Sequence, residues 1–199
     1  EDKMVQLKQP QQFMANEREA VETAYAGDII GLFDPGIFHL GDTLSDGPKL
    51  RFSSIPIFAP EFFARVRPED SMKRKQFMKG LTQLAEEGAI QLFTRNETGF
   101  EELLVGVVGQ LQFDVLEHRL KSEYNVTMLK DSLSFRFVRW IKGEPPVPID
   151  KLKLTSTSGR AVDGDQRPVL LFENEWSIRL AMENNPGLEL SETASRVTY

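Results

Sequence analysis

Residues 71–130 read SMKRKQFMKG LTQLAEEGAI QLFTRNETGF EELLVGVVGQ LQFDVLEHRL KSEYNVTMLK, and two helical patterns in them enclose two strand-like runs. The helical patterns are Ser71–Glu87 and Gln110–Tyr124, where apolar residues recur three and four positions apart. Strand-like or extended runs occupy Phe52–Val66, Ala89–Thr94, Glu102–Val108 and Val126–Lys130. The order β-α-β-β-α-β is typical of the ferredoxin-like, or split βαβ, fold.

Each predicted helix has one apolar face. The first presents Phe77, Leu81, Leu84 and Ala85 at helical spacing, and Gly88 ends it. In the second, Phe113, Leu116 and Leu120 form a stripe that Leu111 and Val115 widen. We therefore expect both helices to cover one side of a four-stranded antiparallel sheet.

The segments on either side indicate two further units, which gives an α+β chain with three parts. Residues 1–50 alternate short apolar runs with Gly, Asp and Pro turns, which predicts part of a β-barrel with too few strands to close. Residues 51–131 form the ferredoxin-like domain. In residues 132–199 the pattern partly restarts, which predicts a smaller α+β unit in which Thr155–Pro168 is a loop.

Composition favours a soluble, cytoplasmic protein. The chain has 199 residues, 40% of them apolar and none of them Cys, so disulfides and thiolate metal sites are excluded. No run is long and apolar enough for a membrane span, and we expect no membrane partner. The net charge of −6 arises almost wholly in the first fifty residues, where nine acidic residues oppose four basic ones. Local basic surfaces can therefore exist in the remainder.

No catalytic constellation is evident. The phosphate-binding sequence G-x-x-x-x-G-K-[ST] is missing, and the only histidines, His39 and His118, are far apart in the sequence. Gly106–Gly109 leads into the second predicted helix, whose N-terminus could hold a phosphate, although tight packing explains these glycines more simply. We predict no catalytic, cofactor or metal residues in this chain.

One local basic concentration stands out at the start of the first predicted helix. Lys73, Arg74, Lys75 and Lys79 lie there, close in sequence to Arg65. Such a cluster can bind RNA phosphates, but it can also be an ordinary solvated surface. The cluster is therefore a candidate contact for phosphate groups.

Several ordered motifs together resemble a known family. Gln110-Leu111-Gln112-Phe113-Asp114 is similar to the third domain of the bacterial peptide chain release factor 3 family of translational GTPases, whereas elongation factor G typically carries Glu-Leu-His-Leu-Glu there. The other matching segments are Gln11–Ala15, Ala26–Leu32, Gly41–Leu44, Phe58–Glu61, Gln83–Ala89 and Arg119–Val126. The resemblance runs from about Met4 through Val126, with a weaker similarity at Phe172–Trp176.

The resemblance implies a translation termination factor that binds ribosomal RNA and protein and promotes the GTP-dependent departure of class I release factors. The GTP-binding domain is not in this sequence, which begins at Glu1 without an initiator Met, so we expect a fragment of a longer GTPase. GTP and Mg²⁺ would bind in that missing domain and not here. The piece would couple the nucleotide state of its own GTP-binding domain to docking on the ribosome. Within this resemblance, the predicted contacts with the ribosome or a neighbouring domain are Lys73, Arg74, Lys75 and Lys79.

Other functions stay open from the sequence. The chain could be a fragment of an elongation factor G-like GTPase, or a stand-alone ferredoxin-like RNA-binding or regulatory module. Ferredoxin-like RNA-binding domains stack bases on aromatic side chains of their central strands. Glu102–Val108 has no aromatic residue, which disfavours that function.

Overall fold

The computed structural model describes most of the chain as two compact units, residues 1–49 and 50–199. The described residues are 4–6, 11–14, 17–20, 23–34, 37–38, 41–48, 50, 52, 58–96, 99 and 101–193. His39 lies outside them. No helix in these ranges is long and apolar enough to cross a membrane.

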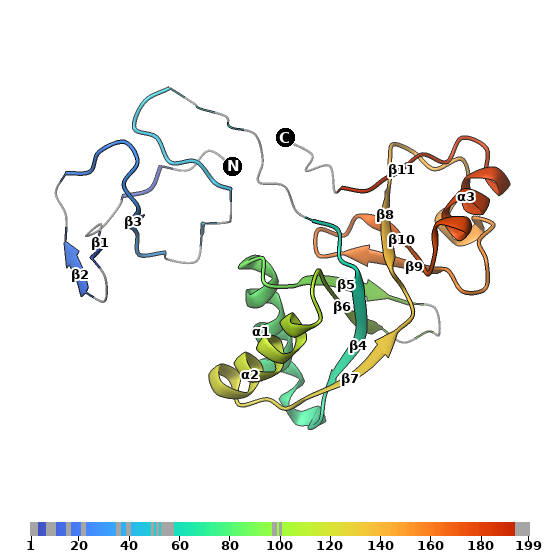
Figure 1. The fold of residues 1–199 in the computed structure, drawn as a ribbon, viewed down its shortest axis with the longest axis horizontal. Helices are drawn as coiled ribbons and strands as arrows, with labels where there is room; N and C mark the ends of the chain where they lie inside the picture. The colour runs from blue at the N-terminus through green and yellow to red at the C-terminus, as the bar shows by residue number, and fades with distance from the viewer. Residues whose placement is uncertain are drawn as a thin grey trace. The chain divides into compact units, whose positions relative to one another are not determined.

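The first unit contains a three-stranded antiparallel sheet (Figure 1). Its strands are β1 (Gln11–Met14), β2 (Glu17–Ala20) and β3 (Ile30–Gly31), in the order β2-β1-β3. Gly27 has a φ of 102°, a left-handed conformation that glycine adopts without strain, and it forms the turn before β3. The strand-and-turn pattern predicted for this part of the sequence is thus present.

The first half of the second unit has the predicted β-α-β-β-α-β order. Its elements are β4 (Phe62–Pro68), α1 (Arg74–Glu86) after the short 3₁₀ helix η1 (Ser71–Lys73), β5 (Gln91–Arg95), β6 (Glu102–Val107), α2 (Leu111–Tyr124) and β7 (Met128–Leu133). The strands pair antiparallel in the order β5-β6-β4-β7, which is the ferredoxin-like arrangement.

Local chemistry fixes where these helices begin and end. Asp70 Oδ1 accepts a hydrogen bond from the Met72 N–H at 2.9 Å, which caps η1. Gly88 follows α1 with a φ of 75°, and Asn125 follows α2 with a φ of 53°. Glycine and asparagine tolerate this left-handed conformation, so both helices stop where the sequence predicts.

The second half continues the same sheet. Its elements are β8 (Phe137–Ile141), η2 (Ile149–Lys151), β9 (Gly159–Asp163), β10 (Pro168–Phe172), α3 (Glu175–Asn184) and β11 (Leu190–Ser191). These strands follow in the order β11-β8-β10-β9, and β5 joins the two halves by pairing with β9 at Phe93 and Thr94. The predicted domain boundary after residue 131 falls within β7, inside one compact unit.

The prediction that Thr155–Pro168 is a loop is wrong for the central part of this segment. Residues 159–163 form β9, which pairs with β10 along four positions. The alternation there is short, and its outward residue Arg160 is charged, so the sequence resembles a loop. The strand forms because Ala161 lies in the core and the Arg160 guanidinium donates to the carbonyl oxygens of Ile149 and Leu152.

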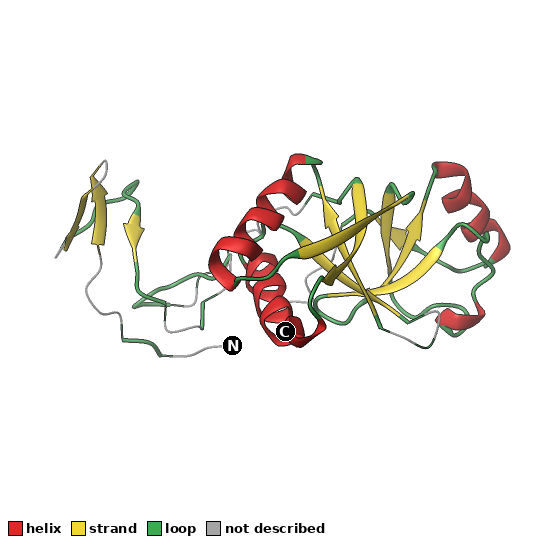
Figure 2. Ribbon diagram, turned by 90° about the horizontal axis from the view of Figure 1, so that it is seen from below, coloured by secondary structure: helices red, strands yellow, loops and turns green. Residues whose placement is uncertain are grey.

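Three buried clusters hold the second unit together. One lies between α1, α2 and the adjacent sheet face, and another packs α3 against β10. The third lies between the two halves of the sheet and consists of Phe63, Phe93, Leu104, Phe135, Val138, Trp140, Ala161, Val169 and Leu171. Figure 2 shows α1 and α2 on one side of the strands and α3 on the other. The central cluster therefore closes the second face of the ferredoxin-like sheet.

Gly106 allows strand β6 to lie close to Pro60 and Phe93. A Cβ atom built there would lie 2.8 Å from Pro60 Cγ and 3.0 Å from Phe93 Cε2. Pro60 and Phe93 are both buried, so neither can move aside without opening the core.

Replacing Gly106 with Ala should therefore overpack the core and lower the free energy of unfolding by about 1–3 kcal/mol. Chemical denaturation of the 199-residue chain would measure the change. The control is Gly109→Ala, because a Cβ atom at Gly109 would meet no heavy atom within 4 Å. Equal stability of the two variants would show that the space between Gly106, Pro60 and Phe93 accommodates the added methyl group.

Candidate functional site

The predicted basic cluster lies where η1 passes into α1. Lys73 is the residue before α1, and Arg74 and Lys75 occupy its first turn, which contains no acidic residue. The N-terminus of a helix carries a partial positive charge, so cations there weaken the helix. The stability of α1 therefore does not explain Arg74 and Lys75.

The four basic residues do not share one role. Lys73 Nζ donates to the carbonyl oxygen of Asn125 at 2.6 Å and so stabilises the C-terminal end of α2. Arg74 Nη2 lies 3.4 Å from Glu101 Oε2, in an exposed pair that contributes little. Lys75 and Lys79 are exposed and form no hydrogen bond or ion pair within the described ranges. Two cations of the cluster are thus available to an anionic partner.

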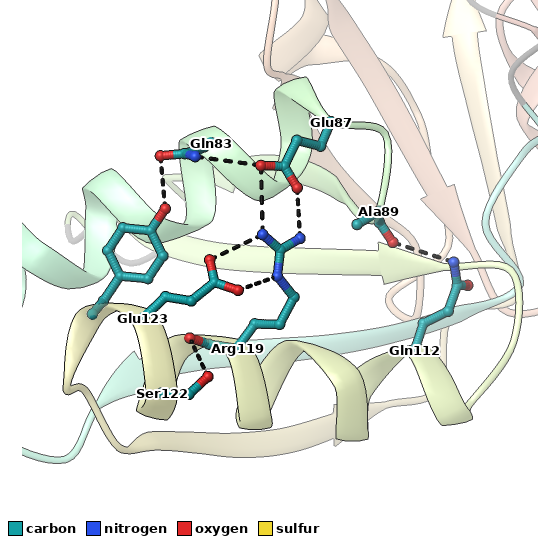
Figure 3. A network of polar contacts seen from close by, with 8 residues as sticks. Gln83, Glu87, Ala89, Gln112, Arg119, Ser122 and Glu123 are labelled. Carbon is teal, nitrogen blue, oxygen red and sulfur yellow. Dashed lines mark hydrogen bonds and ion pairs between the residues drawn. The ribbon is translucent and has the colours of Figure 1, made fainter. Parts of the chain in front are cut away.

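An ion network joins α1 to α2. Figure 3 shows Arg119 between Glu87 and Glu123. The distances are 2.5 Å from Nη1 to Glu87 Oε2 and 2.6 Å from Nε to Glu123 Oε1. Gln83 donates to Glu87 Oε1 and accepts from the Tyr124 hydroxyl. The i, i+4 spacing of Arg119 and Glu123 is visible in the sequence, but the link to Glu87 is not.

The hydrogen bonds from Arg119 hold the pKa values of Glu87 and Glu123 below their usual range. In the other direction, the hydrogen bonds from Glu123 and Glu87 raise the pKa of Arg119. Burial raises the pKa of the Tyr124 hydroxyl. These shifts keep the three charged groups ionised, and the geometry of the network fastens two helices rather than transferring a proton.

Gln112 binds the two backbone amides that precede α2. Gln112 Oε1 accepts hydrogen bonds from the N–H groups of Val108 and Gly109, both at 2.9 Å, and Gln112 Nε2 donates to the Ala89 carbonyl at 3.2 Å. The second Gln of the Gln-Leu-Gln-Phe-Asp motif thus holds the turn that leads into α2 and joins α2 to the connection between α1 and β5. Because these amides have partners, the phosphate site considered at Gly106–Gly109 loses its donors.

Leu111 and Val115 do not widen the buried stripe of α2, and that prediction is wrong. The exposed fraction is 78% for Leu111 and 55% for Val115, whereas Phe113, Leu116 and Leu120 are buried. The core beneath α2 is filled by those three residues together with α1, which leaves no room for a wider face.

The sheet face opposite α1 and α2 is not open to bases. Phe63, Phe93 and Leu104 on this face are buried in the central cluster. The remaining part carries a charge ladder across four strands: Arg95–Glu102 at 2.7 Å, Glu102–Arg65 at 3.2 Å and Arg65–Asp131 at 3.0 Å. The hydrogen bond from Arg95 lowers the pKa of Glu102. A stand-alone RNA-binding module would need this face free for stacking.

Comparison with known proteins identifies the family. The sequence model described as "Class II release factor RF3, C-terminal domain" matches residues 52–182. The chain belongs to the release factor RF3 family. The model of elongation factor G domain 2 matches residues 1–47. The predicted family resemblance and the α+β class are thereby confirmed, and the elongation factor G likeness is confined to the first unit.

Three RF3 relatives, each named peptide chain release factor 3, illustrate the similarity. That of Symbiobacterium thermophilum is 52% identical over 193 residues, which cover 96% of this chain and 36% of the relative. That of Nostoc punctiforme is 41% identical over 194 residues (96% and 35%), and that of Listeria welshimeri is 44% identical over 190 residues (95% and 35%). The chain spans about a third of the length of these curated relatives. The roles of Lys73, Arg74, Lys75 and Lys79 in this RF3 chain stay predictions.

The ion network of the RF3 chain should make its stability depend on pH. The folded pKa of Glu87 lies below its usual value of 4.5, so the network stabilises the fold above that pH and ceases to do so as pH falls through the lower value. Glu87→Gln should flatten this decline in acid by at most about 1 kcal/mol, because the pair is partly solvated.

Denaturant unfolding at a series of pH values between about 3 and 6 would measure the effect. Glu86→Gln is the matched control, since Glu86 is exposed and has no ion-pair partner among the described residues. If the Glu87→Gln curve runs parallel to that of the unchanged chain, the network does not couple pH to folding.

Proposed function

We propose that this chain is the non-catalytic C-terminal part of a translation termination factor. In the complete protein it would bind the ribosome and promote the GTP-dependent dissociation of class I release factors. The match of residues 52–182 to the RF3 C-terminal domain carries this proposal. A continuous eight-stranded sheet supports it further, because a rigid body transmits a domain movement better than two loosely linked units.

GTP and Mg²⁺ would bind elsewhere in the complete protein. The sequence has no G-x-x-x-x-G-K-[ST] element to hold phosphates. Across the part of the chain that the structure describes, no three His, Asp or Glu side chains group to hold a metal ion. The partners that we propose for this chain are its own GTP-binding domain, ribosomal RNA and protein, and class I release factors.

Within the predicted cluster, Lys75 and Lys79 are the best candidates for contact with the ribosome. Both are exposed, and neither forms an ion pair with any residue that the structure describes. Lys73 is engaged by the end of α2, so its substitution would disturb the fold as well as a contact. A surface of two free cations fits the phosphate backbone of RNA.

The double variant Lys75→Glu, Lys79→Glu in the complete protein should bind ribosomes more weakly and release class I factors more slowly. The slope of log affinity against log salt should fall by about one for each lysine that no longer binds a phosphate. Binding and release-factor dissociation would be measured over a salt series.

The control is Lys142→Glu with Lys151→Glu, two exposed residues of the second half whose substitution removes the same charge. An unchanged salt slope in the Lys75, Lys79 variant would rule these residues out as contacts. A complete protein with no effect on class I factors would contradict the proposed function itself.

A further inference from the structure

A small cavity with an unusual arginine lies beside the start of α2. Its volume is about 200 Å³, and Phe62, Gln110, Lys130, Ser132 and Arg136 line it. These residues come from β4, the residue before α2, β7 and the connection between β7 and β8. The cavity is therefore lined by the first half of the sheet, by α2 and by the connection that leads into β8, and the proposed ribosome contact at α1 makes no use of it.

Arg136 is held in place without a carboxylate. Its guanidinium carbon lies 5.1 Å from the centroid of the Phe62 ring, and its main-chain N–H donates to the Phe172 carbonyl at 2.8 Å. Arg65, Arg119 and Arg167, by contrast, each pair with carboxylates. No described residue accepts a hydrogen bond from the Arg136 side chain. A stacked arginine with unused donors is suited to a planar or anionic ligand.

The other groups of the cavity make it positive and rich in donors. Lys130 Nζ lies 5.1 Å from the Phe113 ring centroid and 2.8 Å from Glu117 Oε1, so its charge is partly neutralised. Ser132 is exposed and can donate its hydroxyl, and Gln110 precedes α2 at the positive end of the helix dipole. Arg136 forms no ion pair with any residue that the structure describes.

A larger cavity adjoins the first at Arg136. It measures about 540 Å³, and its walls include Pro60, Glu61, Phe137, Arg139 and Glu192. Arg139 lies 5.3 Å from the Phe137 ring centroid and pairs with Glu192 at 3.0 Å. A volume of a few hundred Å³ suits a nucleoside, whereas the small cavity is large enough only for a group such as phosphate.

We propose that Arg136 is the centre of a binding site for unpaired RNA, with a phosphate in the small cavity and the adjacent base and ribose in the larger one. Stacking on flat side chains and contact with arginine are how proteins hold single-stranded RNA. Glu61 and Glu192 can accept hydrogen bonds from an exocyclic amino group, as on cytosine. An acidic peptide, which is the other anionic partner to consider, has no base with an exocyclic amino group to donate to these two carboxylates.

The site rests on the proposed function only for the source of the RNA, and it can be tested apart from it. Fluorescence titration of the complete protein with oligocytidine and oligouridine would compare the unchanged protein with Arg136→Gln. We expect the affinity of Arg136→Gln to be about ten-fold weaker or more, the size of one charged hydrogen bond. Oligocytidine should bind more tightly than oligouridine.

Arg67→Gln is the matched control, since Arg67 is an exposed arginine on β4 whose side chain contacts no described acceptor and lies outside both cavities. Should Arg136→Gln fail to fold, Ser132→Glu places a carboxylate at the cavity and leaves the Phe62 stack intact; it should also weaken binding. The Lys75→Glu, Lys79→Glu variant should keep its affinity for oligonucleotides. The RNA site at Arg136 and the ribosome contact at Lys75 and Lys79 can thus be tested independently.

A photo-crosslinking side chain at Ser132 would identify the occupant on ribosomes. Crosslinks to ribosomal RNA support the site, while crosslinks to protein alone, or none, overturn it. Equal affinity of Arg136→Gln and the unchanged protein also overturns it, as does tighter binding of polyglutamate than of RNA.

Discussion

The fold of the second unit depends on the burial of both faces of one antiparallel sheet. A ferredoxin-like sheet covered by two helices has one open face, and here that face carries Phe63 and Phe93, whose exposure to water would be unfavourable. The second half supplies the cover through Phe135 and Trp140, and the ring centroids of Phe63 and Phe135 lie 6.3 Å apart in an edge-to-face arrangement. The two halves therefore cannot part without exposing an aromatic core.

This shared core explains which surfaces are left for partners. Because the open face is occupied, the sheet cannot bind RNA as single ferredoxin-like modules do. The surfaces that remain are the outer faces of the helices and the rims where the two halves meet. Lys75 and Lys79 lie on the first kind of surface, and Arg136 lies on the second. Partners of the second unit can therefore bind at its helix faces and at the edges of its sheet, and not on the covered sheet face.

The sequence predicts the elements of the first half well because their signals are local. Capping residues such as Asp70, the left-handed Asn125 and the apolar stripes act within one or two helical turns. The exposure of Leu111 and the strand at Gly159–Asp163 depend instead on distant partners: the filled space under α2 and the edges of β5 and β10. The same limit applies to the candidate site, since a carbonyl fifty-two residues away engages Lys73. Composition alone cannot separate Lys73 from Lys75.

Charge pairing separates structural cations from those available for binding. Arg65, Arg119 and Arg167 pair with carboxylates and hold strands or helices together, so their charges are neutralised within the fold. Lys75 lies in the first turn of a helix, where its charge weakens that helix, and Arg136 rests on an aromatic ring with no carboxylate paired to it among the described residues. The charge of Lys75 lowers helix stability, and the ring contact of Arg136 leaves the N–H donors of its side chain unused. A protein that must attract a polyanion needs such cations, because a pair already neutralised by its own fold has no charge left to offer.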